Sequence, residues 1–322
     1  MVLTITLNPL LERRLIFKNI RIGAVNRAEK DFFTAGGKGI NVSRQLNLLG
    51  IHNSALTFIG GHNGKILRNL IALENIDVTF CSIKNESRQA ALTFDESSQK
   101  LSTFFGADSI VTESEASDFK NKLDKAIQNC STVILSGSSP SETTDDIFPH
   151  AVSLANKYDK ISILDTYGRH LKNCIEQSPT IIHNNFEELQ NSFETDLSAE
   201  ESKIEMMKFL YKKGIRMAFL TNGALPAYAS KFDFHYKVLT PEIIEKDPCG
   251  SGDSFVAGIA YGLENSLVFD DFLKIATALG TANAASFEIS KVSLEQMKYY
   301  YDNVEILPLG KKMKLIDDSP TI

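Results

Sequence analysis

Cysteine is scarce in this sequence of 322 residues, and no two cysteines form a CxxC pair. The four are Cys81, Cys130, Cys174 and Cys249. Their wide spacing argues against a zinc site and against a disulfide framework. We therefore expect free thiols in a reducing compartment, which makes the cytoplasm the expected location.

A long hydrophobic run and an export signal are also missing. No window of about 18 apolar residues occurs in the sequence. The chain runs from Met1 directly into an apolar strand pattern that reaches Leu7, with no basic start and no small-residue cleavage site. The sequence thus predicts no export and no membrane span.

The third absence is an excess of basic residues. Lys and Arg total 34 while Asp and Glu total 40, so the formal net charge is −6. This balance argues against long nucleic acid as a partner, because such binding depends mainly on positive charge facing the phosphate backbone. A small phosphorylated ligand stays compatible with the sequence, since a few local donors can hold it.

What the sequence does contain is a regular alternation of short β-rich runs and amphipathic helical stretches. The strand-like runs are Val2–Leu7, Ser54–Ile59, Thr132–Leu135, Ile161–Leu164, Thr180–Ile182 and Met217–Leu220. Such alternation is typical of an α/β fold with a doubly wound, mostly parallel sheet and helices on both faces. We expect residues 1–322 to form one such domain, with a charged tail that frays from Leu309.

Two insertions, at about residues 11–33 and 88–105, break the alternation. Each carries a strand-like run, Arg14–Phe17 in the first and Ala90–Phe94 in the second, with no long helix directly after it. We expect these strands to pair in a small second sheet at the edge of a cleft, where it could serve as a lid. Plain edge hairpins are the alternative.

The strongest local motif is the segment Asp247–Phe255, in which a glycine-rich turn opens an apolar helical pattern. Gly250 and Gly252 flank Ser251, so successive backbone N–H groups can converge on an anion at the helix N-terminus. Asp253 lies beside that anion hole and could accept a proton from a substrate hydroxyl that attacks a phosphoryl group. Alternatively, Asp253 only caps the helix and the glycines only turn the chain.

A second glycine-rich motif covers Ala35–Arg44 and also leads into a helical pattern. Its three glycines, Gly37 among them, allow a ligand to approach the backbone closely. Lys38 and Asn41 could bond sugar hydroxyls or a phosphate, or could be a solvated charge and an ordinary first-turn polar residue. The spacing is neither the GxxxxGK[ST] of a P-loop nor GxGxxG. The lack of GxGxxG after the first strand also argues against a nicotinamide oxidoreductase.

Together, these two motifs in this order resemble those of the ribokinase-like (PfkB) carbohydrate kinases, and the resemblance covers nearly the whole chain. Thr4–Pro9, Gly36–Arg44 and Ser136–Pro140 look most like the hexose-phosphate branch, which contains 1-phosphofructokinase and tagatose-6-phosphate kinase. The family fold is a doubly wound sheet with a small β lid. The resemblance therefore implies ATP-dependent phosphorylation of a hydroxymethyl group on a ketohexose monophosphate.

The resemblance also implies roles for individual residues. Asp253 matches the catalytic base and Gly250, Ser251 and Gly252 its anion hole. The matches on the substrate side are Glu12, Gly37, Lys38, Asn41, Arg88 and Ser138, with Arg88 meeting the substrate phosphate through its planar fork of donors. The matches on the nucleotide side are Asn185, Glu188, Thr221, Gly223 and Asn283.

The cofactors that the resemblance implies are ATP and Mg²⁺, the latter held mainly through water near Asn185 and Glu188. For those two residues the alternative is a capping pair. The implied partners are a sugar phosphate and ATP, and a homodimer through the lid is compatible with the family.

Three positions depart from the family pattern. Glu12 stands where an aspartate usually binds sugar hydroxyls, His183 stands where a lysine usually meets nucleotide phosphate, and Ala90 stands where asparagine is common. These departures leave the sugar undecided between fructose 1-phosphate and tagatose 6-phosphate. Two further readings therefore stay open: a kinase of an unphosphorylated sugar or nucleoside, and a non-catalytic sugar-phosphate sensor.

Overall fold

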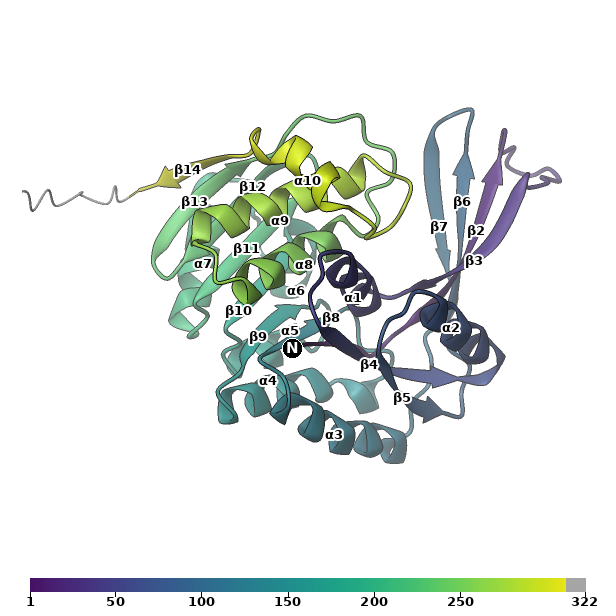
Figure 1. The fold of residues 1–322 in the computed structure, drawn as a ribbon, viewed down its shortest axis with the longest axis horizontal. Helices are drawn as coiled ribbons and strands as arrows, with labels where there is room; N and C mark the ends of the chain where they lie inside the picture. Colours follow the sequence, from purple (N-terminus) through teal and green to yellow (C-terminus); the bar gives the residue numbers. More distant parts are fainter. Residues whose placement is uncertain (311–322) are drawn as a thin grey trace, which may run out of the picture.

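The computed structural model describes residues 1–310, which form a large layered α/β body and a separate small sheet (Figure 1). The strands are β1 Val2–Thr6, β2 Leu10–Phe17, β3 Lys30–Gly36, β4 Asn53–Gly60, β5 Val78–Ile83, β6 Gln89–Asp95, β7 Lys100–Phe105, β8 Thr132–Ser136, β9 Ile161–Asp165, β10 Ile181–Asn185, β11 Met217–Asn222, β12 Leu225–Lys231, β13 Phe234–Leu239 and β14 Glu305–Leu309. The α-helices are α1 Lys38–Leu48, α2 Gly61–Leu73, α3 Glu113–Gln128, α4 Ile147–Lys157, α5 Leu171–Glu176, α6 Phe186–Phe193, α7 Glu200–Lys212, α8 Ser251–Glu264, α9 Phe269–Ala284 and α10 Leu294–Tyr301. The frayed tail expected from Leu309 lies outside the described residues except for Leu309, which ends β14, and Gly310.

The large sheet has the order β14-β13-β12-β11-β10-β9-β8-β1-β4-β5. From β5 to β11 all neighbours are parallel, whereas β12, β13 and β14 extend the sheet as antiparallel strands. The expected doubly wound, mostly parallel sheet is thus confirmed. The antiparallel extension was not expected. The residue pattern of these strands does not distinguish antiparallel from parallel pairing, which only the structure shows.

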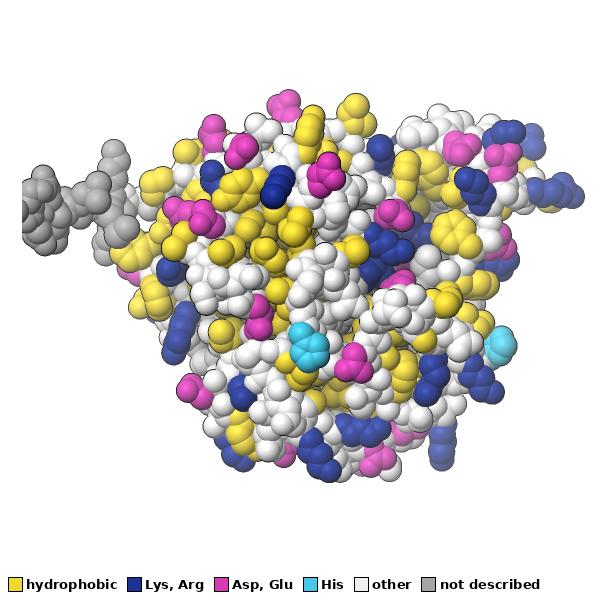
Figure 2. Space-filling view, viewed as in Figure 1, with side chains coloured by type: hydrophobic (Ala, Val, Ile, Leu, Met, Phe, Trp, Pro, Cys, Tyr) yellow, Lys and Arg dark blue, Asp and Glu magenta, His cyan; other side chains and the backbone are white. Residues whose placement is uncertain are grey.

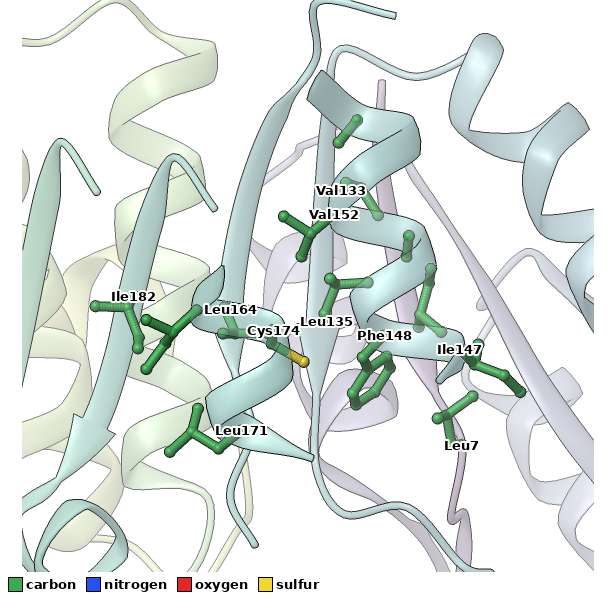
Figure 3. Packing of buried hydrophobic residues seen from close by; sticks show 14 of the residues in the cluster. Leu7, Val133, Leu135, Ile147, Phe148, Val152, Leu164, Leu171, Cys174 and Ile182 are labelled. Carbon is green, nitrogen blue, oxygen red and sulfur yellow. The ribbon is translucent and has the colours of Figure 1, made fainter. Parts of the chain in front are cut away.

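Alternating strand residues divide the core between the two faces of the large sheet. Leu3 and Ile5 of β1 pack on the side of α3, α4, α5 and α7, while Val2 packs with α1, α8 and α9 on the other. Figure 3 shows the first side, where Phe148 and Val152 of α4 point onto Val133 and Leu135 of β8. Each strand therefore contributes side chains to both halves of the core, because successive side chains point to opposite faces.

The small sheet has the order β3-β2-β6-β7, and β2 pairs in parallel with β6. The expectation that the two insertions pair with each other is therefore confirmed. One row of paired residues, Thr34, Glu12, Ala90 and Phe105, shares a face; the next row lies on the opposite face, because side chains alternate along each strand. Phe94 of β6 meets Phe287 of the body edge-on, with ring centroids 5.1 Å apart.

Among residues 1–310, no helix is long and apolar enough to cross a membrane. All four cysteines are free thiols.

Candidate active site

The carboxyl ends of β1, β8, β9, β10 and β11 meet along one edge of the large sheet. From β1 the sheet continues through β4 and β5 in one direction and through β8 to β11 in the other. Ligands of doubly wound sheets bind at such a change of direction. Helices α1 and α8, which carry the two glycine-rich motifs, both begin at this edge. A Cβ on Gly39 would lie 2.4 Å from Oγ1 of Thr6, the last residue of β1, and a Cβ on Gly252 would lie 3.3 Å from Cε1 of His183 in β10.

Asp253 lies in the first turn of α8 and is only 4% exposed. Its Oδ2 accepts a hydrogen bond of 2.7 Å from Nδ2 of Asn41. Burial raises the pKa of Asp253 to about 7, an effect that Lys38 and Asn41 reduce and that the charge of Asp165 strengthens. A carboxylate with a pKa near neutrality is suited to accept a proton at physiological pH.

The loop before Asp253 needs glycine at Gly250. Its φ is 79°, in the left-handed region, and a Cβ there would lie 2.4 Å from Cγ2 of Ile289. The amide of Ser251 already donates to the carbonyl of Pro248 (3.2 Å), whereas the amides of Gly252 and Asp253 have no acceptor within the described residues. These first-turn donors therefore remain open to an anion.

Asn283 of α9 supports this loop from behind. It is 1% exposed, and its Nδ2 donates to the carbonyl of Cys249 (2.7 Å) and to Oγ of Ser251 (3.1 Å). Its Oδ1 accepts from the amide of Ser290 (2.7 Å). Both ends of the Asn283 amide are thus bonded to protein groups. The side chain acts on the site by holding the glycine-rich loop in position.

Lys38 lies among carboxylates. Its Nζ is 3.0 Å from Oε1 of Glu188 and 3.3 Å from Oδ1 of Asp165. Burial by itself would lower the pKa of Lys38, but Asp165, Glu188 and Asp253 together raise it above its usual value. The sequence placed Lys38 with the substrate segment, while the structure places its charge beside the proposed base and the ends of β9 and β10.

Asp165 and His183 link three neighbouring strands. Asp165 is fully buried at the end of β9, and its Oδ1 is 3.0 Å from Nδ1 of His183, whose Nε2 is 3.3 Å from Oγ1 of Thr221. Although burial raises the pKa of Asp165, Lys38 and His183 outweigh it and lower the pKa overall. His183 also stacks on Phe255. Where the family usually has a lysine, this chain therefore has the imidazole ring of His183, which contacts Asp165 and Thr221.

Asn185 and Glu188 form a capping box at the start of α6. Oδ1 of Asn185 accepts from the amide of Glu188 (2.8 Å), and the amide of Asn185 donates to Oε2 of Glu188 (3.0 Å). Asn185 and Glu188 therefore do form the helix-capping pair that was the alternative to a magnesium site. Oε1 of Glu188 also accepts a hydrogen bond from Lys38. Gly223, beyond β11, has a φ of 55° and open space around it.

Glu12 of β2 is buried and points toward the body. Its Oε2 accepts from Oγ1 of Thr34 (3.1 Å) and lies 3.6 Å from Nε of Arg14. Its carboxylate also fills the space over Gly36, where a Cβ would be 2.3 Å from Oε1. Burial raises the pKa of Glu12, while Arg14 and Thr34 lower it in part. Ala90 of β6 is the residue paired with Glu12, and it packs with Leu10 and Leu92.

The small sheet contacts the glycine loop through Arg14, whose Nη1 is 3.4 Å from Oδ2 of Asp247. A pocket of about 330 Å³ opens at this junction, between the small sheet and the body. Its basic lining residues are Arg14, Lys30 and Lys246. Figure 2 shows Lys and Arg side chains gathered where the two parts meet.

Arg88 is part of a polar cluster just before β6 of the small sheet. Its Nη1 donates to Oδ1 of Asp108 (2.9 Å), and Nδ2 of Asn8 donates to the same oxygen (2.8 Å) and to Oγ of Ser138 (3.1 Å). Nε of Arg88 is buried with no protein partner among residues 1–310. Of the Arg88 nitrogens, Nη1 is therefore bonded to the protein, whereas Nε has no partner among the described residues.

The sequence analysis assigned no role to Asp165, Arg14 or Arg44. Asp165 had one local signal, since it follows the apolar run Ile161–Leu164 at the carboxyl end of a predicted parallel strand. Arg44 ends the second glycine-rich motif, but nothing in that motif distinguishes it as a site residue. Arg14 had no signal, because its partner Asp247 is contributed by a distant part of the chain.

Three features together define the class of protein. They are an α/β body whose sheet changes direction at β1, a buried carboxylate beside open helix amides at that edge, and a small sheet over the same edge. These are the features of a phosphotransferase of the carbohydrate kinase class. Comparison with known proteins agrees: residues 8–295 match the model of the pfkB family of carbohydrate kinases. This chain belongs to that family.

Two relatives and one solved structure illustrate the likeness. A tagatose-6-phosphate kinase of Staphylococcus epidermidis is 30% identical over 95% of this chain and 99% of its own length. A 1-phosphofructokinase of Borreliella burgdorferi is 32% identical over 88% of this chain and 92% of its own length. The crystal structure of phosphofructokinase-2 from Escherichia coli has a TM-score of 0.86 at 22% identity, over 94% of this chain and 98% of that one, and shows the shared fold.

Proposed function

We propose that this kinase transfers the γ-phosphoryl group of ATP to a hydroxymethyl oxygen of a ketohexose monophosphate, tagatose 6-phosphate or fructose 1-phosphate. The observation that carries the proposal is Asp253: a buried carboxylate with a pKa of about 7, held by Asn41 next to two amides that have no acceptor among residues 1–310. The names of the two relatives support the substrate class, as does Arg88 with its free Nε.

In this proposal the ionised carboxylate of Asp253 accepts the proton of the attacking hydroxyl. The Gly252 and Asp253 amides donate to the transferred phosphoryl oxygens as negative charge shifts among them. Lys38 lies near enough to Asp253 to attract the same phosphate group. Arg88 and Ser138 bind the sugar's existing phosphate, and Glu12 binds sugar hydroxyls. The small sheet acts as a lid that excludes water, which would otherwise compete as the acceptor.

Mg²⁺ fits this site as a mostly hydrated ion. Within residues 1–310 no group of three or more His, Cys, Asp or Glu side chains could hold a metal directly. Oδ2 of Asp165 and Oδ1 of Asn184 are nevertheless buried acceptors without a protein partner, so they can accept from metal-bound water, as can Glu188. When bound, Mg²⁺ would neutralise charge on the nucleotide phosphates.

Replacing Asp253 by Asn tests the proposal, because the amide keeps the shape of the side chain but cannot accept the proton. We expect kcat to fall by at least ~10²–10⁴-fold while ATP binding is retained. ADP release is measured over a panel of phosphorylated and free sugars and nucleosides, with Asp124→Asn as control, since Asp124 of α3 bonds only to Tyr158 and Gln128 among the described residues. If Asp253→Asn keeps more than a tenth of wild-type kcat, Asp253 is not the base.

The same panel distinguishes the other readings. Turnover of a free sugar or nucleoside as fast as its phosphate would favour a kinase of unphosphorylated substrates. Binding of a sugar phosphate without any ADP release would favour the non-catalytic sensor, although the intact arrangement around Asp253 argues against it.

The outer face of the small sheet supports a homodimer through the lid. The row Phe33, Arg13, Ala91 and Phe104 runs across the sheet on the face opposite Glu12. Phe104 is 61% exposed, and Phe33 is 39% exposed with Arg13 near its ring. Exposed aromatic side chains in a row are suited to a second copy of the sheet. The free thiols support a cytoplasmic location.

A further inference from the structure

Arg44 of α1 is a buried arginine outside the roles described above. All three of its nitrogens are bonded: Nη1 to Oδ1 of Asn41 (2.6 Å), Nη2 to the carbonyl of Ala35 (2.6 Å) and Nε to Oε2 of Glu74 (2.7 Å). The side chain is only 6% exposed. A guanidinium with its planar fork fully engaged has little freedom to move.

The contact to Asn41 matters because the two ends of an amide have nearly the same shape and opposite hydrogen-bonding character. Arg44 can only donate, so the end of Asn41 that faces it is Oδ1. The other end, Nδ2, therefore faces Asp253 as a donor, 2.7 Å from Oδ2. Without Arg44 the amide could rotate and turn its oxygen toward the carboxylate.

A donor from Asn41 favours the ionised form of Asp253, whereas an oxygen in its place would favour the protonated form. The other charged or titratable groups that act on Asp253 are Lys38 of α1, Asp165 of β9 and His183 of β10. None of these three bonds to Arg44, so a change at Arg44 reaches Asp253 through Asn41.

We propose that Arg44 is a positioning residue for catalysis: it fixes the amide of Asn41 as a hydrogen-bond donor to Asp253 and so keeps the base ready to accept a proton. The inference rests on the proposed function of Asp253. It extends that function to a side chain that touches neither substrate nor nucleotide, and to Glu74, which holds the far side of the arginine.

The main test is Arg44→Lys, which keeps the charge but lacks the fork that holds three acceptors at once. We expect the acid limb of the kcat/KM profile to move upward by about one pH unit, which is a tenfold loss on that limb. Activity should recover at higher pH, and KM for ATP should stay unchanged. Glu74→Gln should move the limb in the same direction by less.

Gln45→Ala is the matched control, because Gln45 is the next residue of the same helix and is equally buried. Its side chain makes two hydrogen bonds to the backbone of Val292 (2.7 and 2.9 Å). Losing them should lower the unfolding temperature while leaving the acid limb where it is. An unmoved limb in Arg44→Lys, or the same shift in Gln45→Ala, would overturn the inference.

A second readout does not depend on turnover. The carboxyl ¹³C signal of Asp253, identified by its loss in Asp253→Asn, is titrated in both wild type and Arg44→Lys. A midpoint that is higher in Arg44→Lys supports the inference, and equal midpoints contradict it. If the wild type phosphorylates no sugar phosphate, the proposed function fails, while this titration still decides the role of Arg44.

Discussion

Glu12 is one methylene longer than the aspartate usual at its position, and the structure accommodates that length through Thr34 and Arg14. Glu12→Asp would withdraw the carboxylate from these partners and from the sugar hydroxyls that we propose it binds. We expect kcat/KM for the native sugar to fall by roughly 10- to 100-fold, the ~1–3 kcal/mol of an unsatisfied buried group.

Steady-state kinetics on both ketohexose phosphates measure this effect. Glu29→Asp is the control, since Glu29 is also on the small-sheet segment but is exposed and paired with Lys18. A gain in activity on either sugar would mean that Glu12 is poorly fitted to it. No change on any sugar would mean that Glu12 does not contact the substrate.

Arg88 offers a second prediction for single residues. Arg88→Ala should raise KM for a phosphorylated sugar far more than KM for ATP, because a charge-assisted contact is lost only on the sugar side. Arg21→Ala is the control, since Arg21 is exposed in the loop between β2 and β3 of the same sheet. Equal increases in both KM values would contradict the assignment of Arg88 to the sugar phosphate.

Among the elements, the α8–α9 pair holds the glycine-rich loop before Asp253 in place. The two helices approach closely at Gly262, where a Cβ would lie 2.0 Å from Cβ of Phe272. Gly262→Ala should force the helices apart and destabilise the protein by about 1–3 kcal/mol. Urea unfolding measures this change, and Asn265→Ala, at the exposed end of α8, should have little effect. If Gly262→Ala is as stable as wild type, the packing at this point is looser than the structure indicates.

For the whole molecule, the raised pKa of Asp253 predicts a pH-dependent stability. The folded pKa of about 7 lies above the ordinary aspartate pKa of 3.8. The folded state therefore binds this proton more tightly, and that stabilisation is lost as pH rises from about 4 through about 7. Asp253→Asn cannot ionise, so its unfolding temperature should exceed that of wild type more at pH 8 than at pH 5. A difference that is independent of pH would contradict the raised pKa.

The proposed dimer gives a second prediction for the whole molecule. Phe104→Asp places a charge in the exposed aromatic row of the small sheet and should shift the protein to monomer. Sedimentation velocity at several concentrations measures the shift. Leu225→Asp, at an equally exposed position on β12 of the body, is the control. A wild-type monomer at all concentrations, or equal effects of both variants, would rule out the lid interface.

Much of this architecture could be predicted from the sequence, because it depends on local pattern. Alternating strands and helices predict the parallel sheet, and residue types with special backbone or chemical properties mark both glycine-rich motifs. The strand pattern failed at β10, which was predicted to end at Ile182 and continues through the polar residues to Asn185. There, pairing with β11 outweighs side-chain character.

The sequence by itself therefore determined the family, the parallel part of the large sheet and the identity of the candidate base. Only the tertiary structure decided the environment of that base: Lys38 beside Asp165 and Glu188, and Asn41 held by Arg44 against Asp253. The physical reason is that a sequence motif shows only which chemical groups a segment carries. The pKa of a group, and the direction in which an amide points, depend instead on burial and on partners that are distant in the chain.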